Sequence, residues 1–319
     1  MKTKPKKILY EELVNEWLNY KKDYVKESTY SNYALIVYNH LIPDFKDIYL
    51  QDINHNLLQQ YIIKKLKKGS INKDSSLSQK SVKDIMMVLK NSLRYAMNQE
   101  LLNTIDLNFN YPKNDKKSKV YILSKTEQKK ITQYILKNIT PRNIGVLISL
   151  YSGLRIGEIC ALKWSDIDFK NNTIHVNKTL QRVYLKDSNN TITTSIVITS
   201  PKTTNSNRDI PMSKDFASII RPLKLDSKFY ILTSTYDCLE PRAYRKHFYS
   251  MLRKLKIKTI NFHSLRHTFA TNCISLGIDY KTVSELLGHS NINITLNLYV
   301  HPNLSQKKKC MNTIWKNHY

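Results

Sequence analysis

Apolar residues recur every three or four positions through residues 8–108, which is the spacing of one face of an α-helix. This spacing predicts four helices, which lie around 13–20, 29–41, 57–62 and 79–101. Pro43 is expected to end the second helix, because proline lacks the backbone N–H that a helix interior requires. On pattern alone, this part of the chain is a small helical bundle with lysine-rich rims.

The pattern changes between residues 173 and 212, where Val, Ile and Thr alternate with polar residues. Alternation with a period of two is typical of β-strands that have one buried face. Strands are expected at 173–178, 181–184, 193–199 and 209–212, in one small antiparallel sheet. The polar stretch from Ser200 to Arg208 is expected to form the hairpin turn between the last two strands. The chain is therefore predicted to be mainly α with a small antiparallel β-sheet, an α+β fold.

Two segments indicate the limits of two domains. The stretch 111–120 is polar and rich in lysine, and Pro112 near its start favours an extended linker. Ser124 and Glu127 then stand three residues apart, as in a capping box, and predict a helix that runs to about Lys137. We expect a helical domain at 1–110, a basic linker at 111–120 and a second domain with a C-terminal tail at 121–319.

The apolar helical pattern of residues 144–162 contains a charged pair. Gly153 is expected to break the helix, so that Arg155 begins the next turn. Glu158 lies three residues further on and shares a face with Arg155, where it can hold the guanidinium in position. An isolated pair of this kind is more often a surface ion pair, but the apolar neighbours favour a buried and oriented arginine.

The stretch from His263 to Tyr299 contains several groups that suit phosphate chemistry. His263 and Arg266 are three residues apart and share one face of a predicted helix. An imidazole beside a guanidinium can hold a phosphate oxygen and exchange a proton near it. Gly288 is expected to end the next helix, which puts a second imidazole, His289, in a loop. With Tyr299 ten residues later, the set suggests phosphoryl transfer through a tyrosyl ester.

The charge of the chain narrows the choice of partner. The 319 residues carry a formal net charge of +26, which favours a polyanion, nucleic acid before an acidic membrane. No apolar run approaches the ~20 residues that a membrane span requires, and the basic start is not a signal peptide. The four cysteines lie far apart with no Cys-x-x-Cys, so neither zinc nor a disulfide framework is expected. We therefore expect a cytoplasmic protein that binds nucleic acid and holds no metal.

These motifs resemble the active site of the tyrosine recombinase, or phage integrase, family. The family carries an arginine motif similar to Ser-Gly-Leu-Arg155, then His-x-x-Arg, Gly-His and a nucleophilic tyrosine at about the separation seen here. Pro-Lys202-Thr followed by Arg208 resembles the family's hairpin, whose lysine protonates the leaving 5′ oxygen. The resemblance covers residues 120–305 by motif and 8–108, as a core-binding domain, only by pattern. It implies six catalytic residues: Arg155, Lys202, His263, Arg266, His289 and Tyr299.

The resemblance implies an enzyme that cleaves and rejoins DNA strands at a specific site through a 3′-phosphotyrosyl intermediate, without ATP, metal or cofactor. The two arginines would grip the scissile phosphate, Glu158 would hold Arg155 in position and Tyr299 would attack. A bacterial or phage-encoded, nucleoid-associated enzyme that integrates or excises a mobile element is expected. Its partner would be double-stranded DNA, bound by a homotetramer on two sites, with a monomer off DNA and no membrane.

Basic residues outside these motifs are candidates for DNA contact. We expect contacts from Lys116 and Lys117 in the linker and from Arg242, Arg245 and Lys246 near a helix expected around 244–255. The alternative is a solvated basic face, which is a common role for surface lysines.

Three features of the sequence have no assigned role. The stretch 178–195 is longer than the family requires. Met311, Ile314 and Trp315 stand at helical spacing in the tail and could dock on a neighbouring subunit or cap their own domain. Larger integrases carry a further N-terminal domain, so either a simpler two-domain recombinase or a truncated chain is expected.

Two other hypotheses remain open. A type IB topoisomerase shares the tyrosyl chemistry but relaxes DNA without exchanging partners, and the two-domain size and the hairpin Lys202 argue against it. A DNA-binding relative that has lost catalysis would keep the fold without the reaction, and the six intact residues argue against it. Replacement of Tyr299 by Phe separates an enzyme from a binding protein, since joining would be lost and binding kept.

Overall fold

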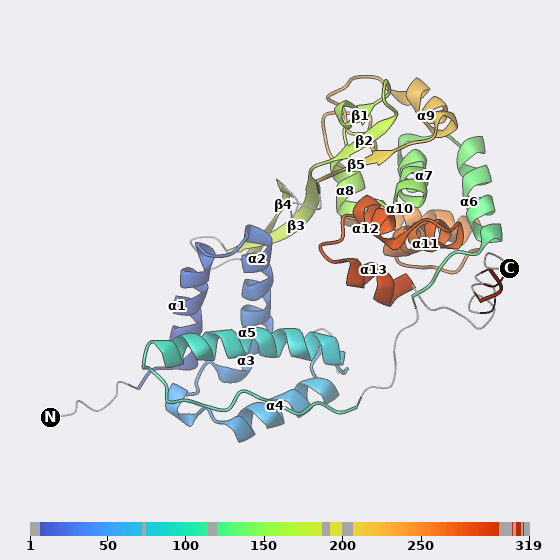
Figure 1. The fold of residues 1–319 in the computed structure, drawn as a ribbon. Helices are drawn as coiled ribbons and strands as arrows, with labels where there is room; N and C mark the ends of the chain where they lie inside the picture. The colour runs from blue at the N-terminus through green and yellow to red at the C-terminus, as the bar shows by residue number, and fades with distance from the viewer. Residues whose placement is uncertain are drawn as a thin grey trace. The chain divides into compact units, whose positions relative to one another are not determined.

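Two compact units make up the structure. The computed structural model describes residues 7–71, 75–113, 120–186, 192–199, 207–299, 308, 311–313 and 315, with backbone alone at 185–186, 192, 294 and 297–299. The first unit spans Met1–Ser118 and Arg182–Ser195, and the second spans Lys119–Gln181 and Ile196–Tyr319. Helices with a small amount of antiparallel sheet confirm the predicted α+β fold (Figure 1). The domain limits expected from the sequence, 1–110, 111–120 and 121–319, remain a prediction.

Helices form the core of the first unit, in the order that the sequence predicts. They are α1 (Tyr10–Lys22), α2 (Glu27–Ile36), α3 (Ile42–Phe45), α4 (His55–Lys67) and α5 (Gln79–Asn98), with a 3-10 turn at Leu50–Asp52. The long helix α5 contributes a stripe of almost fully buried residues: Val82, Ile85, Leu89, Leu93 and Ala96. Within this core, the hydroxyl groups of Tyr10 and Ser92 are hydrogen bonded at 2.9 Å. Among the described residues, no helix is both long enough and apolar enough to cross a membrane.

The second predicted helix does not end before Pro43. A π-helical turn, Val37–Leu41, joins α2 to α3, and Pro43 lies in the first turn of α3. The N–H groups of a first helical turn have no partner within their helix, so proline is tolerated there. The prediction was wrong because the chain begins a new helical segment just before the proline instead of leaving the helix.

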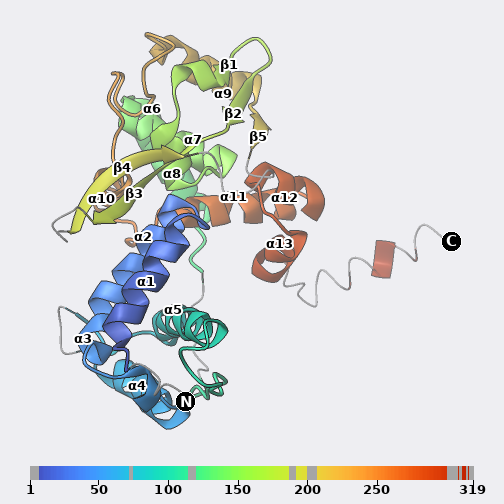
Figure 2. The same cartoon turned by 90° about the vertical axis from the view of Figure 1, so that its left-hand side faces the viewer.

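The stretch 178–195, for which the sequence suggested no role, includes most of a β-hairpin. Its strands β3 (Thr179–Lys186) and β4 (Ile192–Thr199) pair with each other in a two-stranded sheet. The part Arg182–Ser195 belongs to the first unit, where the N–H of Tyr184 donates to Oγ of Ser31 at 2.7 Å. Figures 1 and 2 both show β3 beside α2, and Val183 on this strand is fully buried. The part of the hairpin that belongs to the first unit is therefore packed against α2.

The second unit combines a short sheet with helices. The strands β1 (Ile167–Asp168), β2 (Thr173–Val176) and β5 (Arg208–Pro211) pair antiparallel in the order β1-β2-β5. The helices are α6 (Lys125–Lys137), α7 (Pro141–Ser152), α8 (Ile156–Ala161), α9 (Lys214–Ile220), α10 (Pro241–Lys254), α11 (His263–Ser275), α12 (Tyr280–Leu287) and α13 (Ile292–Tyr299), with 3-10 turns at Trp164–Asp166 and Arg221–Leu223. In the sequence, α8 comes before the sheet, whereas α11, α12 and α13 come after it.

The strand pairing differs from the single sheet that the sequence predicts. Strand β5 pairs with β2, so that Ile174 lies opposite Ile210, while β4 pairs with β3. The strands β4 and β5 therefore do not pair with each other among the described residues, and most of the turn predicted between them, residues 200–206, lies outside those residues. Alternation shows which face of a strand is buried, but the partner strand is set by contacts distant in sequence.

Three helix ends follow the sequence signals. Oγ of Ser124 accepts from the N–H of Glu127 at 3.2 Å, and the Glu127 carboxylate accepts from the N–H of Ser124 at 2.8 Å, which confirms the capping box of α6. Gly153 ends α7 in the left-handed region, with φ of 68°, and the next helix, α8, starts after its N-cap residue Arg155, as predicted. Gly288 ends α12 in the same way, with φ of 62°.

We predict that Gly153→Ala destabilises the protein more than Gly277→Ala does. Both glycines have positive φ, 68° and 85°, where a Cβ costs about 1–2 kcal/mol. At Gly153 the added Cβ would also lie 2.7 Å from Phe269 and 2.8 Å from Leu287, an overlap that costs about 1–3 kcal/mol more. Gly277 has open space around it and serves as the control. Urea unfolding measures both, and equal losses would contradict the packing at Gly153.

Candidate active site

Four of the six residues singled out by the sequence meet in the second unit. Arg155 is the N-cap residue of α8, His263 and Arg266 lie in the first turn of α11, and His289 follows α12. Their proximity is evident in the pKa of His289, which burial lowers most and the charges of Arg266 and Arg155 lower further. Lys202 lies outside the described residues. Tyr299 is the last residue of α13, where the structure describes its backbone only.

The end of α12 organises this site. The N–H of Gly288 donates to the carbonyl of Glu285 at 2.8 Å, and the N–H of His289 donates to that of Ser284 at 3.0 Å. These two bonds form a Schellman turn, which leaves the last carbonyl groups of the helix to find other donors. The turn also fixes the backbone of His289 directly after the helix.

The three carbonyl groups that follow each accept a hydrogen bond from a different arginine. The bonds run from Arg208 Nε to Leu286 at 2.7 Å, from Arg266 Nη2 to Leu287 at 2.6 Å and from Arg155 Nη2 to Gly288 at 3.2 Å. A helix C-terminus carries a partial negative charge and so favours cations. We call Arg155, Arg208 and Arg266, together with Glu158, the guanidinium cluster.

Glu158 is the carboxylate of the guanidinium cluster, and it binds two of the arginines. Arg155 Nη1 lies 2.7 Å from Oε1, as the sequence predicts for this pair. Arg208 donates from Nη1 to Oε1 at 3.1 Å and from Nη2 to Oε2 at 2.9 Å. Burial would raise the pKa of Glu158, but the hydrogen bonds and charge of Arg208, with the charge of Arg155, lower it to about 2. Glu158 is therefore ionised at neutral pH.

The guanidinium cluster retains positive charge for an anion. Three guanidinium groups and one carboxylate give a net charge of +2, since 3 − 1 = 2. The side chain of Arg155 is 35% exposed, whereas those of Arg208 and Glu158 are 5% exposed. Arg155 therefore presents part of this charge to solvent, where a phosphate could bind it in the geometry that guanidinium groups favour.

Both imidazoles at the site are neutral at neutral pH. Desolvation, followed by the nearby His267 and Arg266, lowers the pKa of His263 to about 4. Desolvation, followed by Arg266 and Arg155, lowers the pKa of His289 to about 3. The rings of His263 and His267 meet edge to face, with centroids 4.6 Å apart. A neutral imidazole can accept a proton from a hydroxyl group, which is the role expected of a general base.

Thr295 is a contact of the site that sequence reasoning missed. Its Oγ1 lies 2.8 Å from Nδ1 of His289, and Thr295 is fully buried on α13. This contact fixes the ring of His289 and links it to α13, one helical turn before Tyr299. A threonine six residues after a histidine carries no recognisable pattern, so the sequence offers no signal for this pair.

Arg208 is a second contact that the sequence did not assign to the site. It lies on the same face of β5 as Ile210, which is 2% exposed, so the strand turns Arg208 inward. Strand alternation could have predicted this burial, because Arg208 and Ile210 are two residues apart. The sequence shows no sign of its partner Glu158, which lies 50 residues earlier.

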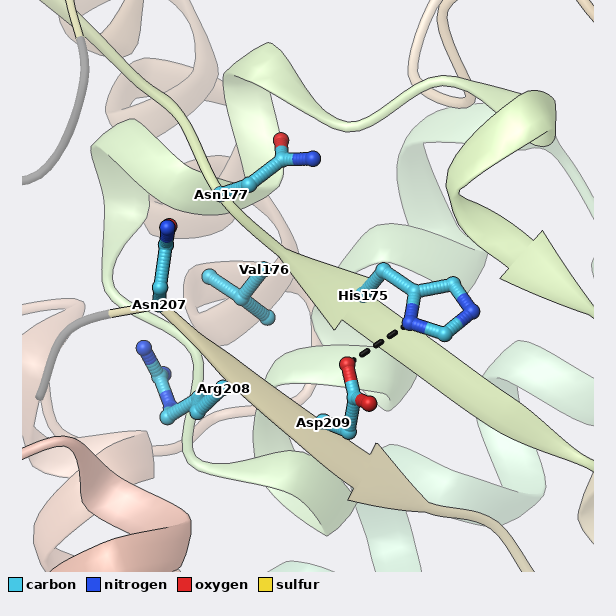
Figure 3. A pocket seen from close by; sticks show the side chains of 6 residues that line it. All are labelled: His175, Val176, Asn177, Asn207, Arg208 and Asp209. Carbon is cyan, nitrogen blue, oxygen red and sulfur yellow. Dashed lines mark hydrogen bonds and ion pairs between the residues drawn. The ribbon is translucent and has the colours of Figure 1, made fainter. Parts of the chain in front are cut away.

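A shallow cleft of about 480 Å³ opens at the end of β2 and β5 (Figure 3). It is lined by His175, Val176, Asn177, Asn207, Arg208 and Asp209. Nδ1 of His175 and Oδ1 of Asp209 are 2.6 Å apart, and both side chains are well exposed. Figure 3 shows the guanidinium of Arg208 directed away from this pair. Of the cleft residues, Arg208 belongs to the guanidinium cluster.

The residues expected to contact DNA outside the motifs are only partly described. Arg242 and Lys246 are exposed on α10, and Arg245 is half-buried on the same helix. Lys116 and Lys117 lie outside the described residues. Among the residues that the structure describes, no group of His, Cys, Asp and Glu has the arrangement of a metal site. DNA contact by these side chains remains a prediction.

We predict that acid destabilises the DNA-free protein from about pH 6.5 downward. The folded pKa values of His263 and His289, about 4 and about 3, lie below the ~6.5 of an unfolded histidine. The unfolded chain therefore binds protons first, and the free energy of unfolding falls as the pH drops from about 6.5 toward 4. Urea unfolding at pH 7.5 and pH 5 measures the loss. A variant with His263→Asn and His289→Asn should lose less between these pH values, and an equal loss would contradict the two assignments.

Comparison with known proteins identifies the family. The model of the phage integrase family matches residues 121–306, and that of the phage integrase N-terminal SAM-like domain matches 9–66. The chain is 30% identical to a tyrosine recombinase XerC-like protein of Caldanaerobacter subterraneus subsp. tengcongensis, over 74% of this chain and 66% of that protein. It is 26% identical to the integrase of Staphylococcus phage L54a, over 93% of this chain and 89% of the phage protein.

A solved structure has the same fold at low sequence identity. The Tn1549 transposon integrase in complex with a circular intermediate DNA superposes with a TM-score of 0.74 at 20% identity, over 96% of this chain and 99% of that one. The guanidinium cluster and the two imidazoles lie within residues 121–306, the part that the first family model matches. The chain therefore belongs to the phage integrase family of tyrosine recombinases, enzymes that exchange DNA strands.

Proposed function

We propose that this chain is a site-specific recombinase that integrates and excises a mobile element by cleaving and rejoining DNA through Tyr299. A net positive guanidinium cluster beside two neutral imidazoles carries this proposal. The helix α13, which ends at Tyr299, follows His289 after two residues and is tied to it through Thr295. A phosphate held by the cluster would thus meet a tyrosine that belongs to the same small group of helices.

The first step forms one bond and breaks one. The phenol oxygen of Tyr299 attacks the scissile phosphorus while its proton passes to His263, whose low pKa keeps it able to accept. The phosphorus–5′ oxygen bond breaks, and the leaving oxygen takes a proton from Lys202. A 3′-phosphotyrosyl link and a free 5′ hydroxyl result. His289 donates a hydrogen bond to the phosphate.

The arginines stabilise the negative charge of the scissile phosphate. Arg155 and Arg266 bind the non-bridging oxygens, whose negative charge grows in the pentacoordinate transition state. A guanidinium carries five N–H donors. Among the residues that the structure describes, the side chain of Arg155 donates once to Glu158 and once to Gly288, which leaves further donors for the phosphate.

The second step reverses the first with a different strand. The 5′ hydroxyl of a partner strand attacks the phosphotyrosine, and Tyr299 leaves with its proton restored. One phosphodiester is exchanged for another through an ester of similar energy, so the cycle requires neither ATP nor a metal ion. The exchange needs a second duplex close to the first, and this requirement determines how many copies of the chain must assemble on DNA.

Stoichiometry supports a tetramer on DNA. Two duplexes exchange four strands, and each cleaved strand occupies one tyrosine, so one complete exchange uses four copies of the chain. We propose that the protein is a monomer off DNA and a homotetramer on two sites. Met311 and Trp315 in the tail are each 65% exposed, and we propose that they contact a neighbouring copy. Its substrate, double-stranded DNA of a bacterial host, would make it a cytoplasmic, nucleoid-associated enzyme.

We predict that Tyr299→Phe abolishes covalent attachment to DNA and leaves binding nearly unchanged. The substitution removes the nucleophilic oxygen and no charge. Wild type and variant are incubated with fragments that span the flanking DNA of the gene, nicked so that the released strand diffuses away. Denaturing gels should show a protein–DNA adduct with wild type alone, and native gels should show equal binding.

The control is Tyr24→Phe, which removes a hydroxyl from an exposed tyrosine of the first unit. This variant should form as much adduct as wild type. Binding by wild type without any adduct, on DNA that contains the recombination junction, would favour a catalytically silent DNA-binding protein. Relaxation of supercoiled DNA without exchange of partners would favour a topoisomerase.

We predict that the assembly depends on DNA. Analytical ultracentrifugation of the protein alone should give a single species near 37.5 kDa, the mass of one chain. With Tyr299→Phe and a duplex that holds the recombination site, the complex should contain four chains and two duplexes. A stable tetramer without DNA would contradict the proposed monomer.

A further inference from the structure

Arg208 is the arginine of the guanidinium cluster that has no role in the reaction described above. Its side chain is 5% exposed, against 35% for Arg155, and Nε, Nη1 and Nη2 all donate to protein oxygens. We propose that Arg208 is a positioning residue, which keeps Arg155 directed at the scissile phosphate and fixes the loop that carries His289. This inference rests on the proposed function.

The first reason to assign Arg208 a positioning role is that it shares the carboxylate of Glu158 with Arg155. Arg208 occupies Glu158 with two parallel N–H groups, at 3.1 and 2.9 Å, whereas the side chain of Arg155 donates one N–H, at 2.7 Å. A carboxylate has about four acceptor positions and forms its strongest pairs with a two-pronged guanidinium. Without Arg208, the buried carboxylate of Glu158 would attract both prongs of Arg155. The guanidinium that should meet the phosphate would then turn inward.

The second reason is that Arg208 also supports the end of α12, the helix that His289 follows. Arg208 Nε is the donor to the carbonyl of Leu286, at 2.7 Å, three residues before His289. Loss of this donor would leave the carbonyl of Leu286, at the helix end, without the hydrogen bond that it has here. The Schellman turn of Gly288 and the ring of His289 would lose one of their supports.

The strand that carries Arg208 gives the contacts a rigid base. Val176 lies opposite Arg208 in the register of β2 and β5. Figure 3 shows the two side chains close together at the end of these strands. Arg208 thus joins three elements: β5, the start of α8 through Glu158 and the end of α12 through Leu286. The relative placement of Arg155 and His289 depends on these same elements.

The test compares three variants in single-turnover cleavage of the nicked DNA at saturating protein. Arg208→Met keeps the length of the side chain and removes its donors. We expect the cleavage rate to fall about 100-fold, the size of effect that a displaced catalytic group produces, with DNA affinity nearly unchanged. Arg208→Lys restores the charge without the fork and should cleave at an intermediate rate. Circular dichroism confirms that each variant is folded at the assay temperature.

The third variant separates positioning from a general structural role. In the double variant Glu158→Gln/Arg208→Met, the neutral amide no longer attracts Arg155. We expect it to cleave about tenfold faster than Arg208→Met alone, a coupling of the size that contacting groups show. Arg221→Met removes an exposed arginine that contacts Phe169 outside the cluster, and it should cleave like wild type.

Each outcome decides the proposal. The predicted order of rates, with binding unchanged, supports it. Cleavage by Arg208→Met at the wild-type rate, parallel loss of binding and cleavage, or a double variant no faster than Arg208→Met would each overturn it. Absence of any wild-type adduct would instead overturn the proposed function, so the two failures are distinguishable.

Discussion

The site depends on the end of α12, where three successive carbonyl groups each accept a hydrogen bond from a different arginine. Neighbouring positive charges repel one another, and burying a charged group is unfavourable. The helix end opposes both effects, since Leu286, Leu287 and Gly288 each accept from one guanidinium and Glu158 neutralises one of the three charges. The result is a preorganised group with a net positive charge and few ways to rearrange before a phosphate arrives.

Burial and charge together set the protonation state of the imidazoles. Burial lowers the pKa of His263 and His289 most, and the nearby arginines lower both further, so the two rings are neutral at neutral pH. One neutral imidazole can take the proton of a tyrosine, and the other can donate to an oxygen of the phosphate. A scissile phosphate would offset part of the positive charge and raise both pKa values, which prepares His263 to receive the proton at the moment of attack.

Local features of the fold were predictable from the sequence, whereas distant pairings were not. The capping box at Ser124 and the stops at Gly153 and Gly288 depend on residues that are close in sequence, and all three are confirmed. Pro43 was misjudged because a π-helical turn changes the register of a helix without a recognisable pattern. The pairing of β5 with β2 is likewise set by tertiary contacts.

The candidate site follows the same division. Motifs located Arg155, His263, Arg266 and His289, which the structure brings together. Arg208 and Thr295 were not predicted because no spacing rule connects either residue to the groups that it contacts, which are Glu158 and Leu286 for Arg208 and His289 for Thr295. The supporting contacts of a site are therefore harder to find in a sequence than the residues expected to do its chemistry.

Mass spectrometry of the trapped protein–DNA adduct identifies the residue that forms the covalent bond with DNA. The chain contains 21 tyrosines, and the proposed mechanism requires that DNA be attached to Tyr299 alone. After digestion by protease and nuclease, the nucleotide should be found on the peptide that contains Tyr299, as a phosphotyrosine ester. Attachment to another tyrosine, or to a serine, would show that Tyr299 is not the nucleophile.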